Sequence, residues 1–412
     1  MSRPRLLFVS PRFLFPIDSG GKIRTTGILR EMKGGRYDIT LLSPEPEDGR
    51  DHTSSLQGIA DRWAFWTPVR GIARRMRRAL HLFHPLPLPV ASDLSASADA
   101  LIARELPRHD VVVFDFIHAA ALAPEPIGTP SVMFTHNVEA QIFERHAKVN
   151  THPVMRRIWS AQWRKMKAFE GRSLKRFDRV VAVSDLDRDG FVDHYGADNV
   201  ETIPTGVDLG FFPYKPMPEP GRVVFTGSMD WMANQDAIEF FLSDIWPLVR
   251  ARRDDATMSV VGRAPPERLQ ARANGVPGFE FTGFVDDVRD YIHRAGVYAI
   301  PLRVGGGTRL KVFEAMASGC PVVSTAIGVE GLGLEDGVHY LNAESPEAFA
   351  EATCRVLDDP TLARSIAGAA RQYVEENASN AIVARRFEQI CDNALGATAN
   401  PTTGLASTGT SR

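Results

Sequence analysis

Three consecutive glycines precede a helical pattern in the second half of the chain, within PLRVGGGTRLKVFEAMASGCPVVS at residues 301–324. The apolar residues before them are typical of a strand, and the pattern from Thr308 to Ser318 predicts a helix that Gly319 ends as a left-handed cap. Glycines permit close approach of a ligand to the backbone, and the first amides of a helix attract phosphate. The sequence therefore predicts an anion-binding site formed by the loop of Gly305, Gly306 and Gly307 and by Thr308, where the helix begins.

Charged residues in the predicted helix support this interpretation. Arg309 and Lys311 stand in its first turn, where a cation opposes the helix dipole unless an anion is bound. Glu314 lies among apolar residues, and its carboxylate could accept hydrogen bonds from the two hydroxyls of a ribose. A solvated Glu314 that pairs with Lys311 is the alternative. The loop is neither a Walker motif nor G-x-G-x-x-G, so a nucleotide would bind in another geometry.

The first half contains a second glycine pair and a histidine at the end of a predicted strand. Gly20 and Gly21 separate the first predicted strand from a helix at about residues 22–33, which allows either a second close-approach loop or a plain turn. His136 follows the strand at residues 131–135, where side chains of a parallel sheet reach a ligand crevice. Most lone histidines are structural. Asp115 and His118, after the preceding strand, are further candidates.

One acidic motif resembles a metal site. Asp185, Asp187 and Asp189 match the start of an EF-hand loop and contain a D-x-D pattern, but the closing glutamate would fall on Gly196. We interpret Ser184 as the cap of a helix with an acidic first turn. The sequence therefore predicts no metal site.

The elements that position these residues alternate between strands and helices. Two such series, separated by a proline-rich segment at residues 213–221, predict an α/β chain of two doubly wound domains. Predicted strands of the first series span residues 5–10, 38–43, 110–115, 130–135 and 179–184. Those of the second span residues 222–227, 258–262, 279–283, 297–302 and 321–325. A final helix is expected at about residues 380–395, before a disordered tail from Ala397.

Composition narrows the functional classes. The chain has 412 residues, 44% of them hydrophobic, and a net charge of −2, which does not indicate nucleic-acid binding. Its three cysteines, Cys320, Cys354 and Cys391, are too few and too dispersed for a disulfide framework, and they fit a reducing compartment. The short apolar run near the N-terminus is too short for a signal peptide or membrane span. We therefore expect a cytoplasmic protein.

The segments GGGTRLKVFEAMASGCPVVST and GFVDDVRDYIHRAGVYAIPLRV resemble the donor-binding region of family 4 glycosyltransferases. The similarity continues through THNVEAQIF, VVAVSDLDRDGF, IPTGVDLGFF and FTGSMDWMANQDAIEFF, and it is strongest to bacterial transferases that build exopolysaccharide or other surface glycans. The resemblance implies a GT-B fold, with two Rossmann-like domains facing an interdomain cleft. It also implies retention of anomeric configuration, no metal or other cofactor, a nucleotide-sugar donor, and a glycan or lipid-linked acceptor.

Roles follow from the resemblance for individual residues. Glu314 matches the second of two glutamates eight positions apart and would bind the ribose, whereas Gly306 stands where the first would contact the transferred sugar. The Arg and Lys that often grip the diphosphate are replaced by Ser228 and Asn234. Arg309 and Lys311 are then the candidates for that charge. Gly20, Gly21 and Gly227 would contribute to donor binding, and His136 would contact the transferred sugar.

The predicted domains are residues 1–212 for the acceptor, 213–221 as linker and 222–378 for the donor. The helix at residues 379–396 would cross back to the first domain, and residues 397–412 would form a disordered tail. In the predicted mechanism the leaving diphosphate accepts the proton of the acceptor, while Arg309, Lys311 and the helix N-termini stabilise its charge.

Two other functions fit the sequence: a sugar-nucleotide epimerase of GT-B shape, which needs no acceptor, and a non-catalytic protein that binds nucleotide sugars. Two basic segments could contact an anionic membrane surface or be solvated helix faces. The first contains Arg70, Arg74, Arg75, Arg77 and Arg78 near Leu80, Leu82 and Phe83. The second contains Arg156, Arg157, Arg164, Lys165 and Lys167 around Trp159 and Trp163.

Overall fold

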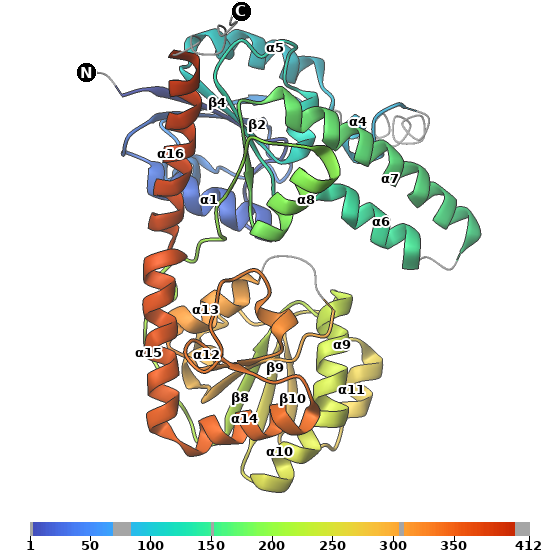
Figure 1. Cartoon of the computed structure of the whole chain (residues 1–412), viewed down its shortest axis with the longest axis vertical. Helices are drawn as coiled ribbons and strands as arrows, with labels where there is room; N and C mark the ends of the chain where they lie inside the picture. Colours follow the sequence, from blue (N-terminus) through green and yellow to red (C-terminus); the bar gives the residue numbers. More distant parts are fainter. Residues whose placement is uncertain (1–2, 69–83, 150–151, 305–308, 400–412) are drawn as a thin grey trace, which may run out of the picture. The chain divides into compact units, whose positions relative to one another are not determined.

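The computed structural model describes residues 3–68, 84–149, 152–304 and 309–399 (Figure 1). The chain divides into two compact units. The first contains the N-terminal part up to Ile203 together with the C-terminal part from Ala384, and the second contains Pro204–Val383. Two predicted features lie outside the described residues, namely the basic segment within 70–83 and the glycine loop at 305–308.

The described part of the first unit is built on seven strands in the order β3-β2-β1-β4-β5-β6-β7, all pairs of which are parallel. Their bounds are β1 Arg5–Val9, β2 Asp38–Pro44, β3 Arg62–Trp66, β4 Val111–Asp115, β5 Ser131–Phe134, β6 Arg179–Ala182 and β7 Val200–Thr202. The five predicted strands are confirmed, and β3 and β7 are additional. Residues on both faces of β1 and β4 are buried, as expected when helices cover both sides of a parallel sheet.

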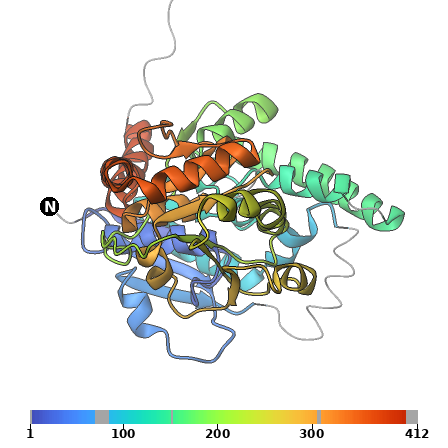
Figure 2. The same ribbon diagram turned by 90° about the horizontal axis from the view of Figure 1, so that it is seen from below.

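Helices connect these strands. The described α-helices of this unit are α1 Gly20–Met32, α2 Thr53–Gln57, α4 Leu88–Asp93, α5 Ala96–Glu105, α6 Glu139–Val149, α7 Pro153–Ser173, α8 Asp185–Tyr195 and α16 Asn380–Ala399, and the short 3-10 helices are η1 Leu106–Arg108, η2 Ile117–Ala121 and η3 Leu174–Arg176. The helices α6 and α7 pack along each other and extend away from the sheet (Figures 1 and 2).

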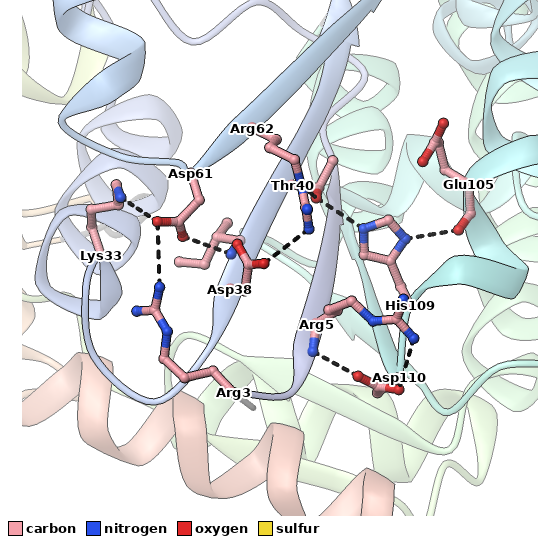
Figure 3. A network of polar contacts seen from close by, with 11 residues as sticks. Arg3, Arg5, Lys33, Asp38, Thr40, Asp61, Arg62, Glu105, His109 and Asp110 are labelled. Atoms are coloured by element: carbon pink, nitrogen blue, oxygen red, sulfur yellow. Dashed lines mark hydrogen bonds and ion pairs between the residues drawn. The ribbon is translucent and has the colours of Figure 1, made fainter. Parts of the chain in front are cut away.

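A polar network fixes the amino ends of the central strands (Figure 3). Arg62 donates to Asp38 over 3.0 Å, which joins the first residues of β3 and β2. The backbone N–H of Arg5 donates to Asp110 over 2.7 Å, which joins the starts of β1 and β4. His109 bridges the Glu105 carbonyl and the Thr40 hydroxyl at 2.7 and 2.9 Å. These contacts leave the opposite, carboxyl ends of the strands for other roles.

The described part of the second unit has six parallel strands in the order β10-β9-β8-β11-β12-β13. Their bounds are β8 Arg222–Thr226, β9 Thr257–Val261, β10 Phe279–Gly283, β11 Val297–Ile300, β12 Val322–Ser324 and β13 Leu341–Asn342. The five predicted strands are again confirmed, and β13 is additional. Alternate residues of β8 enter two separate apolar clusters, Val223 and Phe225 in one and Val224 in the other, so both faces of this sheet are covered.

The helices described in this unit begin with α9 Met232–Phe240 and end with α15. The intervening elements are η4 Phe241–Ile245, α10 Trp246–Arg252, α11 Glu267–Ala273, α12 Arg289–Arg294, α13 Leu310–Ser318, η5 Ala326–Val329 and α14 Pro346–Asp358, and α15 spans Pro360–Asn377. Gly319 ends α13 in the left-handed conformation with φ 81°, which confirms the predicted cap. A Cβ there would lie 2.7 Å from the Tyr214 ring, so packing also requires a glycine.

The chain leaves the first unit earlier than the sequence suggested. Residues 204–212 precede the proline-rich segment, yet Val207 and Phe212 belong to an apolar cluster of the second unit. The last helix, α16, starts in the second unit, and its residues from Ala384 onward belong to the first. It continues to Ala399, so the predicted disordered tail from Ala397 starts too early, and residues 400–412 lie outside the described part.

Candidate active site

The topology places a switch point in each sheet. Neighbouring strands β1 and β4 lead to connections on opposite sides, as do β8 and β11, and ligands of doubly wound folds bind beside the carboxyl ends of such strand pairs. Ser10, Asp115 and His136 follow or end β1, β4 and β5 in the first unit. Gly227 follows β8 in the second. The two groups of predicted site residues therefore belong to different units.

The residues of the first unit form a buried hydrogen-bonded network. His136 Nε2 lies 2.7 Å from Asp115 Oδ1, and His136 Nδ1 lies 2.9 Å from Arg24 Nη1. Because a guanidinium can only donate, Nδ1 accepts, and Nε2 carries the proton that it donates to Asp115. Asp115 also accepts from the hydroxyls of Ser10 and Thr25, each over 3.1 Å. Both ring nitrogens of His136 thus have partners, and the ring is held as one neutral tautomer.

Burial determines the charges in this network. It lowers the pKa of His136, which favours the neutral ring, and it lowers the pKa of Arg24 to about 10, so the guanidinium stays protonated near neutral pH. The opposing charges of Asp187 and Asp115 limit the shift at Arg24. The buried arginine and the buried Asp115 carboxylate therefore compensate each other. Sequence reasoning missed Arg24, because nothing in its helical pattern indicates that its charge is buried.

An aromatic residue covers His136. The Phe116 ring stacks on the imidazole with centroids 4.0 Å apart, and Phe116 has φ 62°, which is rare for a residue with a bulky side chain. A Cβ at Gly21 would lie 2.7 Å from this ring. Gly20 and Gly21 are the first two residues of α1 rather than a loop before it, so the predicted loop is wrong. The Gly21 backbone does allow close approach, but the approaching group is Phe116.

In the second unit, Lys311 is brought to the end of β8. Its Nζ donates to Asn234 Oδ1 over 2.9 Å and lies 4.2 Å from the centroid of the Phe225 ring. Asn234 also donates to the carbonyl of Ser228 over 2.8 Å. A Cβ on Gly227 would lie 2.8 Å from Lys311 Nζ, so a larger residue there would displace the ammonium from this position. Lys311 has no ion pair within the described residues. Burial lowers its pKa to about 7.

Glu314 lies one turn further along α13 and is partly buried. Burial raises its pKa to about 7, while the charge of Lys311 opposes that shift. The described contacts of Lys311 go to Asn234 and Phe225 rather than to Glu314, so the alternative of a simple surface pair between Lys311 and Glu314 does not describe this site.

Arg309 and Arg263 differ in accessibility. Arg309 caps α13 and is only 7% exposed; its Nε donates to the Ile327 carbonyl over 3.0 Å, and its guanidinium lies 3.6 Å from Glu330. Arg263 follows β9, and its side chain is 60% exposed. It donates to the Ser228 hydroxyl over 3.0 Å and pairs with Asp230 at 3.2 Å. Sequence reasoning missed Arg263, because only the adjacency of β8 and β9 brings it to Ser228.

The acidic motif on α8 is a helix cap. Ser184 accepts from the Asp187 backbone N–H, and Asp185 and Asp187 occupy the first turn, which confirms the interpretation of these residues. Within the described residues, no helix is both long and apolar enough to cross a membrane.

Two family models match the chain. The model described as Glycosyltransferase Family 4 matches residues 19–211, and the model described as Glycosyl transferases group 1 matches residues 220–359. The chain belongs to the family 4 glycosyltransferases. The enzymes of this family include a curated relative, the phosphatidyl-myo-inositol mannosyltransferase of Mycobacterium leprae. This chain is 32% identical to it over 204 residues, which are 47% of this chain and 54% of the relative. The match therefore spans about half the length of that relative.

Solved structures of GT-B proteins share the architecture of this family member. Sucrose-phosphate synthase from Thermosynechococcus elongatus aligns with a TM-score of 0.69 at 17% identity, covering 96% of this chain and 100% of that one. Anabaena Alr3699/HepE in complex with UDP and glucose aligns with a TM-score of 0.65 at 13% identity, covering 94% and 99%. At these identities the similarity concerns the fold alone, and it confirms the predicted GT-B class.

The buried network around Asp115 generates a stability prediction. Asp115→Asn keeps the shape of the side chain but removes the negative charge that compensates Arg24, so it should lower the free energy of unfolding by roughly 3–5 kcal/mol. Asp110→Asn at the other end of β4 is the matched control, since its carboxylate is partly exposed and should cost at most about 1 kcal/mol. Urea denaturation of both variants measures the difference. Equal midpoints would contradict the compensation of Arg24 by Asp115.

Proposed function

We propose that this family 4 member transfers a sugar from a nucleotide-activated donor to a glycan or lipid-linked acceptor, with retention of anomeric configuration and without a metal ion. The observation that carries the proposal is Lys311. Its ammonium lies at the carboxyl end of β8 against an aromatic ring and an amide oxygen, without an ion pair within the described residues. A buried cation of this kind becomes favourable when an anion binds beside it.

In this proposal the donor diphosphate lies beside Lys311 and the opening turn of α13. Asn234 stands at the position where relatives often carry a lysine, and the Lys311 ammonium donates a hydrogen bond to the Asn234 side chain. The position where they often carry an arginine is Ser228, and Arg263 is bonded to it. Both cations are thus present, supplied from other strands and helices. We assign the diphosphate to Lys311 and Arg263, while Arg309 anchors the start of α13 to Ile327.

The reaction would proceed by departure of the nucleotide diphosphate and attack of the acceptor hydroxyl on the same face of the sugar. A phosphate oxygen of the leaving group accepts the hydroxyl proton, and Lys311 and Arg263 stabilise the charge that develops. Glu314 would accept hydrogen bonds from the ribose. Both ring nitrogens of His136 have partners, so we assign it to support of the reaction centre through Asp115 and Phe116. The three described cysteines are free and buried, which fits action in the cytoplasm.

Exchanging Lys311 and Asn234, which share a hydrogen bond, tests the proposed donor site. Lys311→Asn should weaken binding of a nucleoside diphosphate by about 10- to 100-fold, because a charge-assisted hydrogen bond is lost. Adding Asn234→Lys should restore binding, because the ammonium returns from the other side. Thermal shift with UDP, GDP and ADP measures both. Unchanged binding in Lys311→Asn would contradict the assignment, and Asn234→Lys alone is the control for the new charge.

The lowered pKa of Lys311 generates a pH prediction. The free protein holds Lys311 with a pKa of about 7, and a bound diphosphate raises that pKa, so binding takes up a proton above neutral pH. Affinity should therefore fall by up to about tenfold per pH unit between pH 7.5 and 9. Lys311→Arg should remove this dependence, because a guanidinium stays protonated. Calorimetric titration of the nucleotide in buffers of different ionisation enthalpy measures the proton uptake. Nucleotide binding by the unaltered protein that does not change with pH would contradict the prediction.

We also propose that α7 contacts an anionic membrane surface when the acceptor is lipid-linked. Its first turns expose Val154 and Met155 beside Arg156 and Arg157, and residues 151–169 contain no acidic side chain. Exposed apolar residues flanked by cations suit a membrane of anionic lipids.

Replacement of both Arg156 and Arg157 by glutamate should abolish sedimentation with phosphatidylglycerol vesicles at low salt, because attraction becomes repulsion. The matched control replaces Arg385 and Arg386, an adjacent exposed pair on α16, by glutamate. This variant should sediment like the unaltered protein. Absence of sedimentation by the unaltered protein, or equal loss in both variants, would contradict a role of α7.

A further inference from the structure

A cavity of about 540 Å³ lies entirely within the first unit. Its walls come from the segment after β1, the segment after β2, the last residue of β3 and the helix α4, and thus from the carboxyl ends of the strands. The volume is sufficient for a small organic molecule or one or two sugar rings. None of the donor-site residues of the second unit lines it.

One buried side chain of this cavity has unused hydrogen-bonding groups. His118, on η2, is only 5% exposed and lines the cavity, yet neither of its ring nitrogens makes a hydrogen bond with the described residues. Its Nδ1 lies 3.3 Å from Asp93 Oδ2, so the ring stands beside this carboxylate. Buried polar atoms normally have hydrogen-bond partners, and an unsatisfied one destabilises the folded protein. A ligand hydroxyl in the cavity would supply the missing partner.

The other walls suit the two kinds of surface that a sugar presents. Phe13, Phe15 and Trp66 contribute aromatic rings, which pack against the apolar C–H face of a pyranose. Glu45 and Asp48 contribute carboxylates, which accept strong hydrogen bonds from hydroxyl groups. Arg12 joins this cavity to the buried network, since its guanidinium lies 4.9 Å from the Phe116 ring that stacks on His136.

The charges of the described lining residues favour a neutral molecule. Two basic side chains, Arg12 and Lys22, stand against the four carboxylates of Glu45, Glu47, Asp48 and Asp93. Lys22 is already paired with Asp18 at 3.1 Å. The His52 ring donates to Asp48, which lowers the pKa of this carboxyl and keeps it ionised. A phosphate group would meet repulsion from these carboxylates, whereas uncharged hydroxyls would not.

We propose that this cavity binds the acceptor, that the acceptor presents an uncharged sugar ring there, and that His118 accepts or donates a hydrogen bond to one of its hydroxyls. This inference rests on the proposed function, because only a transferase has an acceptor. Binding of a neutral sugar in the cavity can nevertheless be tested separately. It predicts that phosphorylated polyols bind more weakly than neutral glycosides.

Saturation-transfer NMR on the full chain tests the inference, with the methyl glycosides of glucose, galactose and mannose and with myo-inositol 1-phosphate as probes. At least one neutral glycoside should bind, and myo-inositol 1-phosphate should bind at least tenfold more weakly. His118→Phe keeps the ring volume but removes both nitrogens, and it should weaken glycoside binding at least tenfold. Asp93→Asn should weaken it as well. Asp99→Asn on the neighbouring α5, outside the cavity lining, is the matched control and should bind normally.

Three results would overturn the inference: no glycoside binds, myo-inositol 1-phosphate binds as tightly as the glycosides, or His118→Phe binds glycosides like the unaltered protein. The same samples are tested by thermal shift with UDP, GDP and ADP. Nucleotide binding without His118-dependent glycoside binding defeats only this inference. His118-dependent glycoside binding in a protein that binds no nucleotide defeats the proposed transferase function instead, and leaves a sugar-binding cavity.

Discussion

A single ammonium group at the carboxyl end of a buried strand is the centre of the proposed donor site. Lys311 lies against Phe225 and is bonded to Asn234, and burial lowers its pKa to about 7. Without an anion this position is unfavourable, because the amide oxygen, the aromatic ring and the charge of Glu314 only partly offset the desolvation of the ammonium. Gly227, directly after β8, leaves room for this group.

In the first unit, the buried charges of Arg24 and Asp115 are compensated by groups of the same unit. Arg24 and Asp115 are both buried, but they share the imidazole of His136, and each therefore has compensation within the unit. Such a network can be rigid without a ligand. His118, in contrast, has two ring nitrogens without a hydrogen bond to the described residues, and Lys311 has no ion pair with them. We propose that residues of the first kind position the site and that residues of the second kind bind a ligand.

Much of this architecture could be predicted from the sequence. Ten strands follow from continuous apolar runs, and the cap at Gly319 follows from a glycine after a helical pattern. Short or half-exposed strands such as β3 and β13 could not be predicted, because their pattern is weak. The predicted loop at Gly20 and Gly21 was wrong because α1 already begins at these two glycines, and the second of them lies against Phe116, where a Cβ would not fit. Arg263 and Arg24 could not be recognised as site residues from the sequence, because only the fold brings them to Ser228 and His136.

A crystal structure of the full chain with a nucleoside diphosphate chosen by the thermal-shift screen tests the central claim most directly. We expect a phosphate oxygen within hydrogen-bond distance of Lys311 Nζ and of the Arg263 guanidinium, at the carboxyl end of β8. A nucleotide bound elsewhere, or one bound there while Lys311 contacts only Asn234, would contradict it.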